Sequence, residues 1–167
     1  ILQALRGSLL FFANILFFYS ISIISMAKAL TLAFVAPLIT TALSPLLLNE
    51  KVGFKRWSAV LIGFFGTLIV IRPGFIDFNI AILAGLGTGL FYGLYLIVTR
   101  KLHTSDNPLL TLLLTGVVGL IFGTFIVPFF WINPTLNQWL LLALMGIFAC
   151  LGHFFLILSL NYADASK

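Results

Sequence analysis

The sequence predicts an all-α polytopic membrane protein with six transmembrane helices, and three observations support this prediction. Of the 167 residues, 62% are hydrophobic and 8% are charged, whereas a soluble domain of this size has about 25% charged residues. The mean hydropathy is +1.21, as expected for a chain whose solvent is a lipid bilayer. The basic residues behind the net charge of +5 lie between long apolar runs rather than in one cluster. We therefore expect the bilayer, and not nucleic acid, as the partner of this chain.

The first four spans are predicted from uncharged runs. A hydrocarbon core of about 30 Å needs about 20 helical residues. The runs that meet or approach this length are residues 7–27, 29–49, 57–71 and 78–99. The third run is short, but Trp57 and the arginines at its two ends can anchor it at the membrane interfaces.

The last two spans share one long uncharged stretch, from Asn107 to Ala163. Ile132, Asn133 and Pro134 break this stretch, because Asn and Pro together favour a turn. Trp131 and Trp139 flank the break, as tryptophans do at membrane interfaces. The break therefore divides the stretch into a fifth and a sixth span.

The positive charges predict the orientation of these spans. Six crossings place the connections alternately on two sides of the membrane. One side carries seven basic residues, which are Arg6, Lys51, Lys55, Arg56, Arg100, Lys101 and Lys167, and the other carries two, Lys28 and Arg72. By the positive-inside rule the first side is cytoplasmic.

The span over residues 78–99 has two faces at 100° per residue. Small residues share one stripe (Ala81, Gly85, Gly89, Gly93), and hydroxyl residues share the stripe beside it (Thr88, Tyr92, Tyr95, Thr99). The opposite face is aliphatic (Leu83, Leu86, Leu90, Leu94, Ile97). In a bilayer the aliphatic face meets lipid, while the glycines admit a neighbouring helix closely. For Tyr92 and Tyr95, both packing and cavity lining remain open.

The second span contains two helix-kink candidates, Pro37 and Pro45. Each lacks an N–H and therefore frees the carbonyl four residues earlier. In a membrane such a break persists where protein or a water-filled cavity satisfies the backbone. A kink needed only for packing is the alternative.

The residues after this span carry a family resemblance. The run from Ala36-Pro37 to Pro45, followed by Leu48-Asn49-Glu50-Lys51, Trp57, Gly63, Gly66 and Arg72-Pro73-Gly74, resembles the signature of the EamA-like transporters of the drug/metabolite transporter superfamily. Arg6-Gly7 before an apolar helix is similar to the third helix of that family. The resemblance implies ten helices in two inverted five-helix repeats around a central cavity. This chain is then an internal fragment, with residues 1–74 as the last three helices of the first repeat and 75–167 as the first three of the second.

Six residues are candidates for substrate binding. Asn14, Phe18 and Ser22, with Ser25, share one face of the first span at helical spacing. His153 is an ionisable residue well inside a span, which makes it a functional candidate, although its imidazole bonded to a backbone carbonyl is the alternative. The resemblance implies that these residues surround the central cavity together with Tyr92 and Tyr95.

The resemblance implies a secondary-transporter fragment that moves a small organic metabolite across a bacterial-type inner membrane by alternating access. The alternative is a structural or regulatory membrane subunit that packs through the glycine stripe. We expect no enzyme, because no cluster of His, Asp or Glu lies near one interface. We also expect no cofactor and no metal, and the sequence leaves a homo-oligomer open. Glu50 is expected to cap or orient, or to pair with Lys51, Lys55 or Arg56 as a gate.

Overall fold

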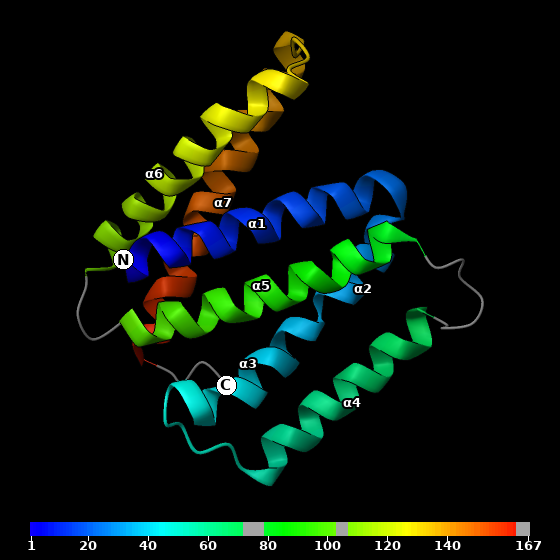
Figure 1. The fold of residues 1–167 in the computed structure, drawn as a ribbon, viewed down its shortest axis with the longest axis vertical. Coiled ribbons are helices and arrows are strands. Elements are labelled where there is room, and N and C mark those ends of the chain that lie inside the picture. Colours follow the sequence, from blue (N-terminus) through cyan, green and yellow to red (C-terminus); the bar gives the residue numbers. More distant parts are fainter. Residues whose placement is uncertain (72–78, 103–106, 163–167) are drawn as a thin grey trace.

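The computed structural model describes residues 1–71, 79–102 and 107–162, and the elements in these residues are all helical. They are α1 (Leu2–Ile23), α2 (Met26–Ala33), α3 (Val35–Leu47), α4 (Phe54–Ile71), α5 (Ile80–Leu102), α6 (Pro108–Ile126), the 3-10 helix η1 (Val127–Phe130) and α7 (Leu136–Tyr162). Figure 1 shows their arrangement. The predicted all-α polytopic membrane fold is confirmed.

Five stretches of the described residues are long and apolar enough to cross a membrane. They are α1, α2 with α3, α5, α6 with η1, and α7 as far as Ser159. The helix α4 occupies the position of the third predicted span. The chain between η1 and α7 is not helical, and it contains the predicted break at Asn133 and Pro134.

The central helix is α5, which has α1 on one side and α2 and α3 on another (Figure 1). The glycine stripe of α5 makes the second contact close. A Cβ atom at Gly89 would lie 2.9 Å from the carbonyl oxygen of Ala33, and one at Gly93 would lie 2.9 Å from Cβ of Ile39. The stripe therefore packs a neighbouring helix, as the sequence predicts.

The aliphatic face of α5 is exposed in the first half of the helix. Leu83, Leu86 and Leu90 are exposed, which fits the predicted lipid face. The prediction is wrong for Ile97, which is only 2% exposed. It lies about 200° around the helix from Tyr95, which is also buried. Neighbouring elements therefore enclose the last turns of α5 on both sides.

The second span is interrupted between α2 and α3 at Phe34, whose ψ is 0°. The interruption lies three residues before Pro37, whose nitrogen cannot donate to the carbonyl of Ala33. Pro45 lies inside α3, which continues to Leu47. The break coincides with the place where Gly89 comes closest to the backbone of this span.

The turn between α1 and α2 shows that one prediction about Ser25 is wrong. Ser25 does not share the face of Asn14 and Ser22 on α1, because α1 ends at Ile23. Ser25 instead caps α2, and its side chain accepts a hydrogen bond from the backbone N–H of Lys28. A serine oxygen at this position satisfies an otherwise unpaired helix donor.

Candidate functional site

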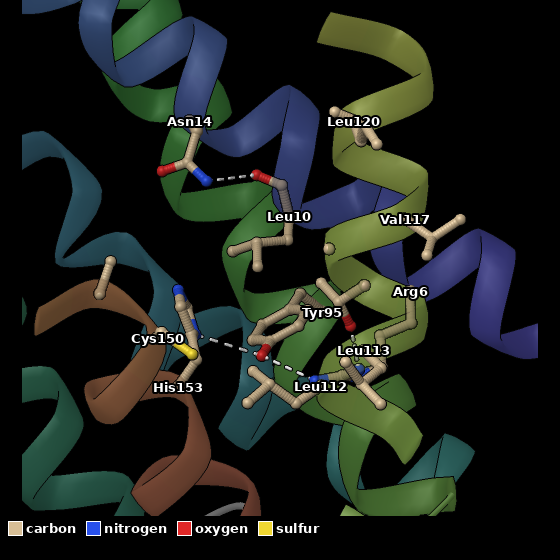
Figure 2. Close-up of a pocket in the computed structure, with 13 residues that line it drawn as sticks. Arg6, Leu10, Asn14, Tyr95, Leu112, Leu113, Val117, Leu120, Cys150 and His153 are labelled. Carbon is tan, nitrogen blue, oxygen red and sulfur yellow. Dashed lines mark hydrogen bonds between the residues drawn. The ribbon is translucent and has the colours of Figure 1, made fainter. Parts of the chain in front are cut away.

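A pocket of about 540 Å³ lies between α1, α5, α6 and α7. Figure 2 shows the side chains that surround it. Its polar lining residues are Arg6, Asn14, Tyr95, Thr115 and His153. Its apolar lining residues include Leu10, Leu112, Leu113, Val117 and Leu120. The pocket therefore combines a few polar groups with mostly aliphatic walls, as small-molecule sites do.

Arg6 is fully buried beside this pocket. Its Nε donates to Oγ1 of Thr99 at 2.8 Å, and its Nη1 donates both to the carbonyl oxygen of Thr111 at 2.8 Å and to Oγ1 of Thr115. Its Nη2 donates to Oη of Tyr95 at 3.0 Å. One side chain of α1 thus fastens α1 to both α5 and α6.

Thr99 and Thr115 direct their hydroxyl protons at carbonyl oxygens of their own helices, which leaves the oxygen lone pairs to accept from Arg6. Oγ1 of Thr99 donates to the carbonyl oxygen of Tyr95, and Oγ1 of Thr115 donates to that of Thr111, each one turn earlier at 2.7 Å. A helical threonine bonded in this way turns its lone pairs away from its own backbone. The i, i+4 pairs on α5 and α6 therefore present oxygen acceptors to one guanidinium.

Gly7 explains how Arg6 reaches α6. A Cβ atom at Gly7 would lie 2.7 Å from Cβ of Val118, so α1 and α6 approach more closely here than a side chain would allow. The Arg6-Gly7 pair therefore supplies a cation and the space that lets it contact the next helix. The sequence predicts that Arg6 precedes the first span, and this boundary is wrong because α1 begins at Leu2.

Tyr95 connects Arg6 to His153. Its Oη lies 3.3 Å from Nδ1 of His153, and the two rings meet edge to face with centroids 5.8 Å apart. Because Oη accepts from Arg6, its own proton is available for Nδ1. The resulting chain runs from a buried guanidinium through a phenol to an imidazole, and Figure 2 shows Tyr95 Oη between the other two groups. A neutral imidazole that accepts from Oη at Nδ1 carries its proton on Nε2.

The structure brings together three of the six predicted site residues. Asn14, Tyr95 and His153 all line the pocket. Nδ2 of Asn14 donates to the carbonyl oxygen of Leu10 at 3.1 Å, which leaves its Oδ1 available to accept. His153 bonds a phenol rather than the backbone carbonyl considered as its alternative.

The other three predicted residues lie outside the pocket lining. Phe18 is 51% exposed, and Oγ of Ser22 donates to the backbone carbonyl of Tyr19 at 2.7 Å. Tyr92 stacks on Tyr95 with ring centroids 5.6 Å apart, so it supports a site residue from behind. We therefore place the candidate site at Asn14, Tyr95 and His153.

Sequence reasoning missed Arg6, Thr111 and Thr115 as members of this cluster. A signal was present, because Thr111 and Thr115 are spaced one turn apart like Tyr95 and Thr99. Both pairs lie near the span ends on the side that carries Arg6. Two pairs of hydroxyl residues at helical spacing, near an arginine at a span end, thus predict that both pairs accept hydrogen bonds from that arginine.

A second polar contact lies at the same end of the bundle. Oε1 of Glu50 accepts from Nε of Arg100 at 3.2 Å, and both side chains are mostly buried. Arg100 was not among the three cations considered as partners of Glu50. The pair joins the segment after α3 to the last turn of α5.

The chain matches one protein family over nearly its whole length. A family described as "EamA-like transporter family" matches residues 1–72 and 79–167. No solved structure matches the chain.

Three curated proteins illustrate the similarity. An S-adenosylmethionine uptake transporter of Rickettsia bellii (strain RML369-C) is 28% identical over 162 residues, which are 97% of this chain and 56% of that protein. A riboflavin transporter of Vibrio cholerae serotype O1 is 32% identical over 83% of this chain and 47% of that protein. An uncharacterized transporter of Helicobacter pylori (strain ATCC 700392 / 26695) is 30% identical over 92% of this chain and 54% of that protein. The chain spans about half the length of these relatives.

Proposed function

This chain belongs to the EamA-like transporter family, and from this premise we propose that the full-length protein carries a small organic metabolite across the membrane by alternating access. The family and the apolar spans make it an integral protein of the bacterial inner membrane. Its relatives are named transporters of S-adenosylmethionine and of riboflavin. These names support a small-metabolite substrate.

The pocket between α1, α5, α6 and α7 is the observation that carries this proposal. Its volume of about 540 Å³ lies within the range of about 300 to 1,000 Å³ that is usual for small-molecule sites. Its polar groups come from four separate helices, which are α1 (Arg6, Asn14), α5 (Tyr95), α6 (Thr115) and α7 (His153). Convergence of this kind orients a substrate, while the leucines contact its apolar part.

The position of the pocket in the chain supports alternating access. We propose that residues 1–74 and 75–167 belong to two inverted repeats, so that α1 comes from the first repeat and α5, α6 and α7 from the second. The pocket then lies between repeats, where transporters built from inverted repeats hold their substrates. Rocking of one repeat against the other would open this pocket to each side of the membrane in turn.

The structural-subunit alternative has less support. In that alternative, the glycine stripe of α5 must be free to pack against a helix of another protein. Gly85, Gly89 and Gly93 instead contact α2 and α3 of the same chain, so the stripe is already covered. We therefore favour transport.

The proposal is tested by comparing metabolites in bacteria with and without the full-length protein. Mass spectrometry of cells and medium should find at least one small metabolite whose distribution depends on the protein. Ala149 lines the pocket, and Ala149→Phe should abolish this difference because a phenyl ring fills the binding space.

Ala143→Phe is the matched control. It places the same ring on the same helix at an exposed position that is not part of the pocket lining. This variant should keep the metabolite difference at a similar amount of protein in the membrane. The proposal fails if no metabolite depends on the protein, or if the two substitutions act alike.

A further inference from the structure

We infer that the pocket binds the carboxylate of a small organic substrate, with Arg6 supplying the charge and His153 the contacting donor. This inference rests on the proposed transport function and names the chemical class of its substrate. It starts from a buried cation without a counter-charge in the part of the chain that the structure describes.

Arg6 is solvated by its neighbours but is not neutralised by them. Four of its five N–H groups donate to three neutral side-chain oxygens and one backbone oxygen, and the fifth, on Nη2, has no acceptor among the described residues. Glu50 is the single carboxylate in those residues, and it pairs with Arg100. A cation in apolar surroundings is costly unless an anion accompanies it. The pocket beside Arg6 is where that anion can enter.

The charge acts on the pocket without direct contact. Arg6 and Tyr95 are both 0% exposed, whereas His153 is partly exposed. In a medium of low dielectric constant a charge attracts over several ångströms. A chain of hydrogen bonds also strengthens its last donor, so the bonds from Arg6 through Tyr95 make Nε2–H of His153 a stronger donor. In Figure 2 this nitrogen lies on the side of the ring turned toward Asn14.

The charge count and the volume select the anion. Arg6 is the one charged residue among the described residues that line the pocket, so a single negative charge gives a neutral site. A carboxylate meets this condition, whereas a phosphate monoester carries an excess of negative charge. The volume of about 540 Å³ is larger than one inorganic ion needs, and the aliphatic walls suit an organic group. An organic molecule with one carboxylate therefore fits both parts of the site.

A matched pair of probes tests the inference in the full-length protein. Uptake into proteoliposomes is measured for S-adenosylmethionine and for decarboxylated S-adenosylmethionine, which lacks only the carboxylate. We expect a preference of at least about tenfold for the carboxylate form, the effect of one good charge-assisted contact. Arg6→Gln should reduce the preference to about one.

Arg6→Lys separates the effect of the positive charge from the effect of the hydrogen bonds by which Arg6 joins α1 to α5 and α6. Lysine keeps the positive charge but cannot reproduce the forked bonds of a guanidinium. If the charge selects the substrate, Arg6→Lys keeps most of the preference, whereas a purely structural role predicts equal damage from Arg6→Lys and Arg6→Gln. Lys28→Gln removes an exposed cation outside the site and should leave the preference unchanged.

The outcomes also separate this inference from the proposed function. If riboflavin, which has no carboxylate, or the decarboxylated probe is taken up at the same rate as S-adenosylmethionine, the carboxylate inference is overturned. The proposed transport function then still stands. If neither adenosyl compound enters, the metabolites found by mass spectrometry decide, because they must carry a carboxylate and must lose their dependence on the protein in Arg6→Gln. If no metabolite depends on the protein, the proposed function itself fails.

Discussion

The guanidinium of Arg6 donates to Oη of Tyr95 at 3.0 Å, and its Cζ lies 4.9 Å from the centre of the same ring, although 89 positions separate the two residues. The phenol therefore contributes both a neutral acceptor and a polarisable ring face to a buried cation. Its Oη also lies within hydrogen-bond distance of Nδ1 of His153, at 3.3 Å. Tyr95 is the residue through which the structural cation and the pocket are connected.

Tyr95→Phe tests this connection. The substitution keeps the ring and removes Oη, which deprives Arg6 of one acceptor and His153 of its partner. Leaving a buried donor unsatisfied costs about 1 to 3 kcal/mol, so the thermal unfolding temperature of the full-length protein in detergent should fall. Uptake of the metabolites that the wild type moves should also fall. Tyr19→Phe is the matched control, because the side chain of Tyr19 is 43% exposed, and it should change neither quantity.

His153→Ala addresses the contacting donor of the site. It removes the imidazole that lines the pocket but leaves the bonds between Arg6 and α5 and α6 in place. Uptake should fall about tenfold, the equivalent of about 1.4 kcal/mol of lost hydrogen bonding, while the amount of protein in the membrane stays nearly constant. Leu90→Ala, on the exposed face of α5, should alter uptake little. If uptake falls only in proportion to protein amount, His153 is a packing residue.

Gly89→Ala tests the close contact between α5 and the break in the second span. The new methyl group would lie 2.9 Å from the carbonyl oxygen of Ala33 and 3.2 Å from the nitrogen of Ala36, and both atoms belong to the backbone. The helices must therefore separate, and we expect a loss of thermal stability. Replacing glycine by alanine in an unobstructed helix is otherwise favourable by roughly 0.5 to 1 kcal/mol.

Gly123→Ala supplies the control for Gly89→Ala. Nothing lies within 4 Å of the Cβ position at Gly123, so this substitution should be neutral or slightly stabilising in the same thermal unfolding assay. Equal stability of the two variants would contradict the close packing at Gly89.

The sequence predicts the spans, the break near Asn133 and the packing role of the glycine stripe, because each depends on residues close together in the chain. The cluster around Arg6 depends on residues 89 to 109 positions away, which no local pattern relates to it. An arginine near a span end is usually an interfacial charge that reaches water. Its burial follows from the approach of α6 at Gly7, a property of the packed structure.

The site residues divide in the same way. Asn14, Tyr95 and His153 stand out in the sequence because polar groups in apolar spans are uncommon. Phe18 and Ser22 share the helical face of Asn14, but α1 extends past the pocket, which is lined from α1 by Arg6, Leu10 and Asn14 alone among the described residues. Helical spacing thus identifies a face, and the neighbouring helices decide which part of it is lined.

Cys150 offers a probe of alternating access. It is the single cysteine of the 167 residues, and it lines the pocket. In a full-length protein whose other cysteines are replaced by serine, a membrane-impermeant maleimide should label Cys150 from either side of the membrane, and transported metabolite should slow the reaction. Ala143→Cys in a Cys150→Ser background should react poorly, because this exposed position lies within a membrane span and outside the pocket, where we expect it to face lipid rather than water. Labelling from one side alone under all conditions would argue against alternating access.

The orientation in the membrane can be tested at two connections. The positive-inside count of seven to two becomes six to two when the buried Arg6 is left out, so the bias persists and predicts a cytoplasmic segment at Lys51, Lys55 and Arg56. The ion pair of Glu50 with Arg100 places that segment at the same end of the bundle as the last turn of α5.

The turn at Asn133 lies between two tryptophans whose ring centroids are 6.1 Å apart. Tryptophans are typical of a membrane interface, and this turn should face the other side. An engineered cysteine at Lys55 should therefore react with an impermeant maleimide only from the cytoplasmic side, and one at Asn133 only from outside. The reverse pattern would show that the predicted orientation is wrong.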